Sequence, residues 1–314
     1  MKCGLCPRQC SVDRRKGEKG ICGQTDEIKV ARAALHMWEE PCISGIKGSG
    51  AVFFCGCALH CVFCQNDRIA NGTVGKIITQ EHLAEIFLEL QEKGANNINL
   101  VTAGQFVPQV IPALKSAKEQ GLFIPVVYNT SSYENADTIK SLAGLVDIYL
   151  PDFKYVDSGL AKKYSHAPDY FRVASEAVRE MVCQVGEPVF YTPGSGQQYD
   201  SAAYNEICDG EKELLMWRGV IARHLLLPGC EKDSREVLSY LINTYGKRIY
   251  ISIMNQFTPP SKCGEYPELQ HKITASDYEK MIDFALDLGI ENAFIQEGET
   301  AQESFIPDFD GEGV

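Results

Sequence analysis

The sequence predicts an α/β fold, a partial (β/α)6 TIM-like barrel preceded by a Cys-rich module. Short apolar segments alternate with segments of helical period from residue 51 to about 300, an alternation typical of a parallel sheet with right-handed crossovers. Polar residues also follow most of the predicted strands, at the carboxyl ends where ligands gather in such folds. We therefore predict a metal-binding module at residues 1–50, the barrel at 51–300, and an acidic C-terminal tail at 301–314 that is mobile at its end.

The individual elements follow from short-range signals. Thr79 can cap a helix that ends at Gly94 and carries an apolar stripe at residues 83, 86, 87 and 90. Pro108 lies in the first turn of the next helix, which ends at Gly121, and Thr274 or Ser276 can cap the last helix. Further helices are predicted at 160–164 and 171–185. Strands are predicted at 51–54, 98–102, 122–128, 146–150, 188–191, 219–227, 248–253 and 293–296.

Composition narrows the class of protein. The chain has 314 residues, with 42 acidic and 30 basic side chains and a net charge of −12. A large negative field opposes phosphate backbones, so we expect no nucleic-acid partner. The start of the chain has no signal-peptide pattern and the sequence has no long apolar span, so we expect a cytoplasmic protein without a membrane partner. Thirteen cysteines in that compartment indicate metal sites and reactive thiols, not a disulfide framework.

Three cysteines directly after the first predicted strand carry the strongest signal. Cys57, Cys61 and Cys64 have the spacing C-x3-C-x2-C. Three ligands from one loop would leave one iron of a 4Fe–4S cluster open, whereas electron-transfer ferredoxins bind all four irons with cysteine. A structural zinc would need a fourth ligand, for which His60 is the nearest histidine. The third interpretation is that the three cysteines are buried free thiols. Their close spacing at a strand end makes this chance arrangement the weaker explanation.

A second group of cysteines lies near the start of the chain. Cys3, Cys6, Cys10 and Cys22 have the spacing C-x2-C-x3-C-x11-C. A segment this short lacks the apolar residues for a core of its own, so a metal held by the four thiolates would stabilise it. The spacing leaves open a zinc ion, an auxiliary iron–sulfur cluster, or a thiol-bearing arm packed on the barrel.

The cysteine loop, with Phe63 before its last cysteine and Asn66 after it, resembles the signature loop of the radical S-adenosylmethionine (SAM) enzymes. Residues 51–297 look like the barrel of the pyruvate-formate-lyase-activating type, and the N-terminal motif is similar to that of activating-enzyme-like members. The resemblance implies a 4Fe–4S cluster whose open iron chelates SAM. It also implies an electron supply from a flavodoxin or a ferredoxin-like protein.

The resemblance further implies the residues that bind SAM. The family's Gly-Gly-Glu turn, which holds the SAM amino group, corresponds to Ala103-Gly104-Gln105, where Gln105 departs from the expected carboxylate. Lys154 would pair with the SAM carboxylate, and Asp152 would hold the amino group or a neighbouring cation. A zwitterionic amino acid next to a cluster needs one group of each sign.

Three other strand ends complete the implied pocket. Arg223 would lie near the sulfonium or the adenosine. Asn129 and Ser131 would reach the ribose hydroxyls, and Asn255, or Gln256 beside it, stands where a ribose-binding histidine is common. For each of these residues, a strand-end cap or a structural ion pair is the alternative.

The predicted function is reductive cleavage of SAM to a 5′-deoxyadenosyl radical, followed by hydrogen abstraction from a substrate. Activation of a glycyl radical enzyme is the specific activity that the resemblance implies. Radical modification of a peptide or small metabolite is an alternative, and a noncatalytic iron–sulfur or zinc protein is another. Residues 193–217 form an insertion near the expected mouth of the barrel, where they either cover the substrate or form a solvated loop.

Overall fold

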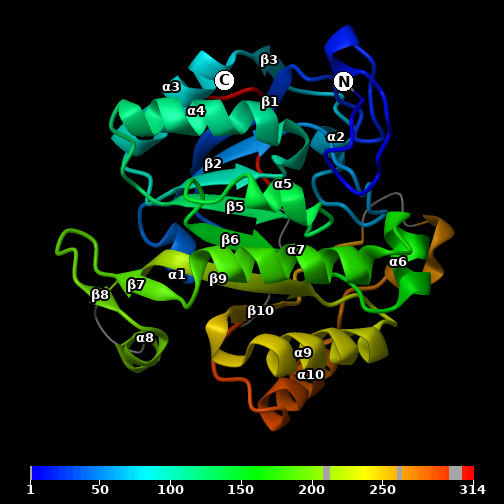
Figure 1. Cartoon of the computed structure of the whole chain (residues 1–314). Coiled ribbons are helices and arrows are strands. Elements are labelled where there is room, and N and C mark those ends of the chain that lie inside the picture. Colours follow the sequence, from blue (N-terminus) through cyan, green and yellow to red (C-terminus); the bar gives the residue numbers. More distant parts are fainter. Residues whose placement is uncertain (1, 208–212, 260–263, 297–305) are drawn as a thin grey trace.

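Parallel strands in chain order form the centre of the structure, a computed structural model that describes residues 2–207, 213–259, 264–296 and 306–314. Each pairs with the next along the chain, so the α/β class and the mostly parallel sheet are confirmed (Figure 1). These strands are β2 (Ser49–Phe54), β4 (Ile98–Val101), β5 (Val126–Thr130), β6 (Ile148–Pro151), β9 (Leu215–Leu225), β10 (Tyr250–Met254) and β11 (Ala293–Ile295).

Antiparallel strands extend this sheet at its first edge and at the start of β9. β1 (Ile28–His36) pairs with β2, and β3 (Lys76–Ile78) pairs with β1. A hairpin of β7 (Val189–Tyr191) and β8 (Gln198–Tyr199) pairs with the first residues of β9. The described strands therefore run from β11 to β3 without closing into a ring, as in a partial barrel. Because β1 belongs to this sheet, the sheet reaches into the first 50 residues.

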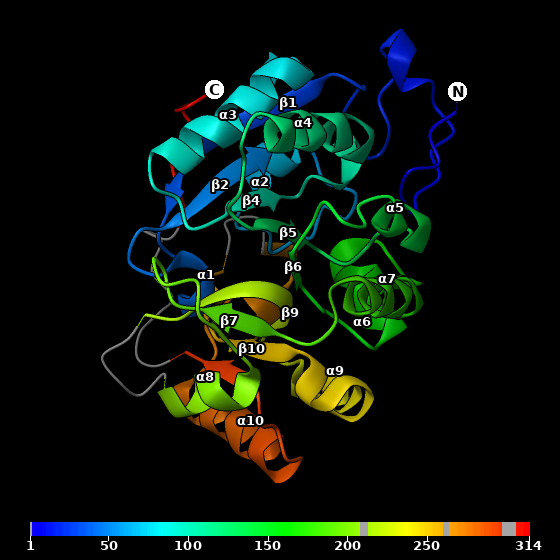
Figure 2. The same ribbon diagram turned by 60° about the vertical axis from the view of Figure 1, so that its left-hand side comes forward.

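The long helices between the parallel strands lie along the outer side of the sheet (Figures 1 and 2). The long ones are α3 (Gln80–Glu92), α4 (Val107–Glu119), α7 (Tyr170–Val185), α9 (Glu231–Tyr245) and α10 (Ala275–Asp287). The shorter ones are α1 (Pro41–Ser44), α2 (Asp67–Ala70), α5 (Ala136–Lys140), α6 (Ser158–Ser165) and α8 (Ser201–Ile207). Single 3-10 turns are η1 (Arg14–Lys16), η2 (Gly104–Phe106), η3 (Gly246–Arg248) and η5 (Pro267–Leu269). No helix in the described ranges is long and apolar enough to cross a membrane.

Local sequence signals predicted the starts of two helices, α3 and α10, correctly. The Thr79 hydroxyl accepts a hydrogen bond from the His82 N–H (3.1 Å), and the Thr274 hydroxyl accepts one from the Asp277 N–H (3.1 Å). Each satisfies a donor that the first helical turn leaves free. The apolar stripe of α3 is fully buried, as its spacing predicted.

Other elements differ from the prediction. An apolar residue can be buried in a loop as well as in a strand, so an apolar run does not by itself mark where a strand begins. β5 begins at Val126, not Leu122, since residues 121–125 form a connecting loop in which Leu122 is buried while Phe123 is exposed. β9 begins four residues early because its first residues pair with β7. The helix α9 was missed, although its buried residues Val237, Leu238 and Leu241 have helical spacing.

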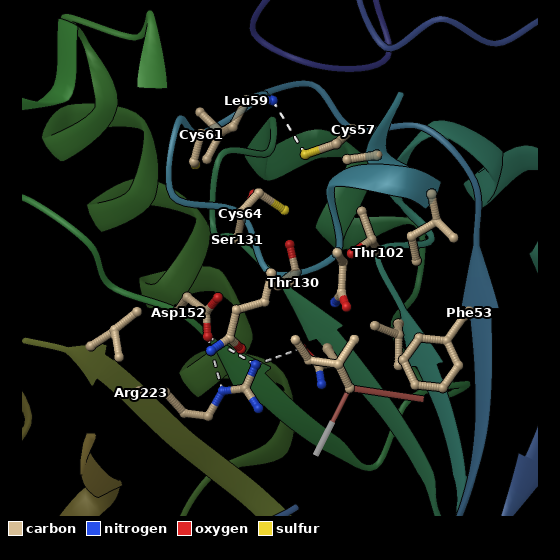
Figure 3. A pocket seen from close by; sticks show the side chains of 18 of the residues that line it. Phe53, Cys57, Leu59, Cys61, Cys64, Thr102, Thr130, Ser131, Asp152 and Arg223 are labelled. Carbon is tan, nitrogen blue, oxygen red and sulfur yellow. Dashed lines mark hydrogen bonds and ion pairs between the residues drawn. The ribbon is translucent and has the colours of Figure 1, made fainter. Parts of the chain in front are cut away.

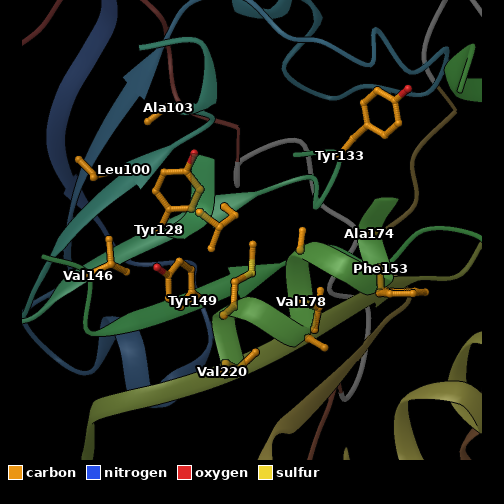
Figure 4. Close-up of a cluster of buried hydrophobic side chains, with 14 of the residues drawn as sticks. Leu100, Ala103, Tyr128, Tyr133, Val146, Tyr149, Phe153, Ala174, Val178 and Val220 are labelled. Carbon is orange, nitrogen blue, oxygen red and sulfur yellow. The ribbon is translucent and has the colours of Figure 1, made fainter. Parts of the chain in front are cut away.

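The main core lies between the sheet and the outer helices (Figure 4). Tyr128 and Tyr149 from neighbouring strands meet edge to face, with ring centroids 6.0 Å apart. Both rings are fully buried, and each hydroxyl donates to a side-chain oxygen, Tyr128 to Glu134 and Tyr149 to Gln184. The core therefore buries aromatic surface without leaving these two phenols unpaired.

The end of the chain, residues 306–314, packs against β1, where the sequence led us to expect a mobile end. The backbone bonds Gly311 N–H to Ala31 C=O and Ala33 N–H to Glu312 C=O add an extended segment to the strand. Arg32 on β1 forms ion pairs with Asp310 and Glu312. Acidic residues thus attach the tail to a basic side chain, and residues 301–305 lie outside the described residues.

The described part of the insertion 193–217 does not lie at the mouth of the barrel, which corrects the expectation that it covers the substrate there. The β7–β8 hairpin pairs with residues 215–218, which precede the residue of β9 that pairs with Ile148 at the start of β6. This is the amino end of the parallel strands, opposite the cysteine loop (Figure 1). The described part of the insertion therefore packs at the far end of the barrel.

A buried histidine makes stability depend on pH. Burial lowers the pKa of His224 on β9 to about 4, and its Nδ1 bonds to the Phe153 carbonyl (2.8 Å). The unfolded chain binds this proton below about pH 6.5, so stability falls as the pH drops from 6.5 toward 4. The free energy of unfolding falls by up to about 3 kcal/mol over this range, at 1.36 kcal/mol per pKa unit.

We predict that His224→Asn, which keeps a donor for Phe153, reduces this pH dependence, measured by urea unfolding between pH 7 and 4.5. Burial, and then the charge of Arg32, also lower the pKa of His36 to about 4. His36 therefore still contributes its own part of the pH dependence in this variant. The exposed His271→Asn is the control. An unchanged slope in the His224 variant would contradict the assignment.

Candidate functional site

A cavity of about 230 Å³ lies at the carboxyl ends of the parallel strands, under the cysteine loop (Figure 3). We call it the main cavity. It brings together residues from the ends of β2, β4, β5, β6, β9 and β10, from the loop after β2, from the end of β1 and the segment after it, and from the C-terminal segment. Its lining includes Glu39, Cys57, Cys61, Phe63, Cys64, Asn129, Ser131, Asp152, Lys154 and Arg223.

The loop that carries the three cysteines needs glycine at its first turn. Gly56 has φ +90°, and a Cβ there would lie 2.4 Å from the Gln24 side chain and 2.6 Å from the Cys22 carbonyl. Only glycine adopts this conformation without strain while the N-terminal segment packs this closely. The loop then turns so that Cys57, Cys61 and Cys64 all face the main cavity.

The three thiols have few polar contacts of their own. The Ser165 hydroxyl donates to Cys61 Sγ (2.9 Å), and the Leu59 N–H donates to Cys57 Sγ (3.4 Å). Burial raises the pKa of Cys61 to about 11 and raises that of Cys64 further. Thiolates here require a compensating positive charge, such as metal ions would supply.

An ionic network fills the opposite wall of the main cavity. The Arg223 guanidinium donates to Asp152 Oδ1 (2.9 Å), Glu39 Oε2 (2.9 Å) and Asn129 Oδ1 (2.7 Å). Lys154 Nζ lies 2.9 Å from Asp152 Oδ2. Burial opposes ionisation of Asp152, yet Arg223 and Lys154 together hold its pKa below the usual value. Asp152 is therefore an anion between two cations.

The main cavity contains most of the residues predicted from the strand ends. Asn129, Ser131, Asp152, Lys154 and Arg223 all line it. Asn255 is not among the lining residues, although Met254 and Gln256 on either side are. The predicted roles of these residues in SAM binding stay predictions.

Gly104 and Gln105 lie elsewhere, beside a second and smaller cavity. The Gln105 side-chain amide donates to the carbonyls of Cys55 (2.8 Å), Gly56 (3.1 Å) and Thr102 (2.7 Å). It therefore ties the turn after β4 to the start of the cysteine loop. A glutamate could not donate these bonds, which gives a structural reason for the amide at this position.

Sequence reasoning missed the contribution of the segment after β1. His36, Trp38 and Glu39 line the main cavity, and so do Ile306 and Pro307 near the C-terminus. These residues reach the site because β1 pairs with β2 and the C-terminal segment pairs with β1. No local pattern predicts such long-range pairing, so no sequence signal could have found them.

The donor set in the main cavity suits a cluster. Among the residues that the structure describes, no three His, Cys, Asp or Glu side chains converge on one metal-ion position. Cys57, Cys61 and Cys64 are spread around one shared space, where each can bind a different iron atom. His60, the fourth ligand that a zinc would need, instead bonds through Nε2 to the Ile21 carbonyl (2.8 Å).

Comparison with known proteins agrees with this chemistry. Residues 51–184 match the Radical SAM superfamily. The matched segment begins in β2 and ends in α7, so it includes the three cysteines, Asp152 and Lys154. The superfamily implies a 4Fe–4S cluster and SAM, which Cys57, Cys61 and Cys64 would hold together with the strand-end residues.

Similar proteins have been found among sequences and solved structures. An uncharacterized protein of Methanocaldococcus jannaschii is 26% identical over 290 residues, which cover 90% of this chain and 74% of that protein. Streptococcus suis SuiB, solved with its precursor peptide SuiA, has 13% identity and a TM-score of 0.47, covering 77% of this chain and 46% of SuiB. A domain of a pyruvate-formate lyase-activating enzyme from Bacteroides vulgatus has 14% identity and a TM-score of 0.38. The match covers 61% of this chain and 91% of that domain.

We predict that Lys154→Ala weakens SAM binding. A charge-assisted hydrogen bond contributes about 1.5–3 kcal/mol. The dissociation constant should therefore rise about 10- to 150-fold, at about 1.4 kcal/mol per tenfold change. The measurement is a SAM titration of the reconstituted protein, followed by the EPR spectrum of the reduced cluster. The exposed Lys162→Ala on α6 is the control. An unchanged affinity with normal iron content would place Lys154 outside the SAM site.

Proposed function

We propose that the protein is an enzyme that cleaves SAM reductively at a 4Fe–4S cluster and abstracts a hydrogen atom from its substrate. The observation that carries this proposal is the main cavity itself. Within the segment that matches the Radical SAM superfamily, three cysteines line one cavity together with a Lys–Asp pair. When bound there, the cluster and SAM supply a 5′-deoxyadenosyl radical.

The chain's own residues would orient SAM by charge. Lys154 presents an ammonium group for a carboxylate, and its pKa is raised because Asp152 and then the Cys61 thiol outweigh the effect of burial. Asp152 presents a carboxylate for an ammonium group or a cation. Arg223 holds Asp152 in place and is itself fixed by Glu39 and Asn129. This hydrogen-bonded network would fix the position of these groups before SAM binds.

Positioning also protects the chemistry. A carbon radical reacts with any C–H bond beside it, so the site must exclude water and hold one substrate hydrogen close. Phe63 of the cysteine loop is buried and packs edge to face against Phe257, with ring centroids 6.4 Å apart. The ionic network closes the cavity on the side of the strands. These same features argue against a noncatalytic electron carrier, which needs no such pocket.

For the substrate, we infer a protein partner, namely a glycyl radical enzyme that this protein activates. The main support is that the insertion 193–217 packs at the amino end of the strands, so its described part supplies no lid over a small molecule. The N-terminal arm, residues 2–27, lies beside the cysteine loop and offers a docking surface. A flavodoxin or ferredoxin-like protein would supply the electron, and the cytoplasm is the compartment that suits free thiols.

A peptide or small metabolite is the second candidate. Ile306 and Pro307 line the main cavity, so the C-terminal segment covers part of the space that a substrate would use. A covered cavity suits a small substrate better than an inserted protein loop.

We predict that Cys61→Ala abolishes SAM cleavage. Without this ligand the cluster loses one of three attachments, and 5′-deoxyadenosine formed with dithionite should fall below detection. Cys183→Ala, which removes an exposed thiol on α7, is the matched control and should retain the parent rate. A Cys61 variant that cleaves SAM at the parent rate would end the proposal.

The substrate is tested by incubating the reconstituted enzyme with SAM, reductant and the glycyl radical proteins of its own host. We expect a stable glycine-centred EPR doublet on one of them. If no doublet forms while a metabolite extract stimulates 5′-deoxyadenosine formation, the activation proposal is wrong and the small-molecule candidate replaces it.

A further inference from the structure

The four N-terminal cysteines meet in one place. Cys3, Cys6, Cys10 and Cys22, which the sequence spreads along the arm, all line the smaller cavity, of about 40 Å³. Cys57 of the catalytic loop lines the same cavity. The smaller cavity therefore lies directly against the main cavity, and Cys57, Thr102, Thr130 and Ser131 border both.

The backbone of the arm is folded around these thiols. Cys3 N–H bonds to the Val12 carbonyl (2.8 Å), and Ser11 N–H bonds back to the Cys3 carbonyl (2.9 Å). A Cβ at Gly20 would lie 3.3 Å from Cys10 Sγ and 3.7 Å from Cys22 Sγ, so the glycine backbone packs on two sulfurs. The Ile21 N–H donates to Cys10 Sγ (3.2 Å). Such N–H···S bonds are typical of the surroundings of cluster thiolates.

The size of the smaller cavity distinguishes two kinds of metal site. A zinc ion bonded to four sulfurs at about 2.3 Å fills the space between them. One water-sized body needs about 10–15 Å³ on this scale, so 40 Å³ leaves room for about three. The cavity that these cysteines line together with twelve other residues is therefore larger than a single ion needs.

The N-terminal arm is hydrogen-bonded to the cysteine loop that carries Cys57, Cys61 and Cys64. The Arg8 guanidinium donates to the carbonyls of Ala58 (2.8 Å), Ser165 (3.1 Å) and His166 (2.5 Å). Arg14, which is buried and lines the smaller cavity, donates to the Gln105 carbonyl (2.6 Å) and offsets the negative charge that thiolates bring. Glu134 is the acidic side chain in the lining, and its Oε1 accepts from Tyr128 and Thr130.

We propose that Cys3, Cys6, Cys10 and Cys22 hold a second 4Fe–4S cluster, adjacent to the first, that passes electrons to it. Four cysteines bind all four irons and leave no open site, which suits electron transfer and not substrate binding. Held there, the second cluster would take one electron from a low-potential one-electron donor and give it to the cluster at Cys57, Cys61 and Cys64. The relay role rests on the proposed function, whereas the presence of the second cluster does not.

The site is tested in a Cys57→Ala/Cys61→Ala/Cys64→Ala variant purified without oxygen. We expect about four irons and four sulfides per chain, with a reduced EPR spectrum that SAM does not change. Addition of Cys10→Ala to the triple variant should remove this iron. One zinc per chain, or no metal, overturns the proposal. Because this variant cannot use SAM, the result does not depend on whether the radical chemistry is correct.

If the triple variant does not fold, iron counts on single variants decide the same question. The unaltered protein should hold about eight irons and Cys10→Ala about four, whereas equal counts overturn the second cluster. Adjacency is tested in the fully reduced, unaltered protein, where two neighbouring paramagnetic clusters should broaden and split each other's EPR signals. A spectrum equal to the sum of the two separate clusters overturns the placement beside Cys57.

Discussion

The register of the parallel strands decides which side chains meet in this protein. Val101 pairs with Asn129, Asn129 with Leu150, and Asp152 bridges to Arg223 across β6 and β9. Because parallel strands end at the same edge, residues far apart in the chain arrive at one level above the barrel. A shift of one residue in any strand would turn its site residue toward the other face. The main cavity therefore depends on backbone pairing before any side-chain contact forms.

Charge balance is the second constraint on the site. Arg223 and Lys154 are largely buried, and each has a carboxylate within 3 Å, at Glu39 and Asp152 for the arginine and at Asp152 for the lysine. A buried charge without a partner would cost several kcal/mol, about 3–5 kcal/mol when one member of a pair is removed. The cavity thus holds a preformed set of paired charges, into which a zwitterionic ligand can enter without leaving one sign unpaired. Pairing also fixes the side chains in position, so a ligand would meet groups that are already oriented.

The N-terminal arm contacts the main cavity through the loop that carries Cys57, Cys61 and Cys64. Gly56 packs against Cys22 and Gln24, Arg8 bonds to Ala58, and His60 bonds to Ile21. The arm has little regular secondary structure, so these contacts and its own turns hold it on the barrel. A change in the arm is therefore transmitted to the position of Cys57 by direct contact. This connection makes the arm part of the active region and not a separate appendage.

The sequence by itself determined the class of the fold, the cysteine loop and most strand-end residues of the main cavity. These features rest on local properties: helix caps such as Thr79, apolar periodicity, and the spacing of Cys57, Cys61 and Cys64. Each depends only on residues that are close in the sequence. Only the tertiary structure decided that Glu39 fixes Arg223, that Gln105 binds the backbone of the cysteine loop, and that the β7–β8 hairpin lies at the far end of the barrel. It also decided that Cys22 and Cys57 border one cavity. These outcomes depend on strand pairing and segment docking between distant residues, for which a single sequence carries no periodic signal.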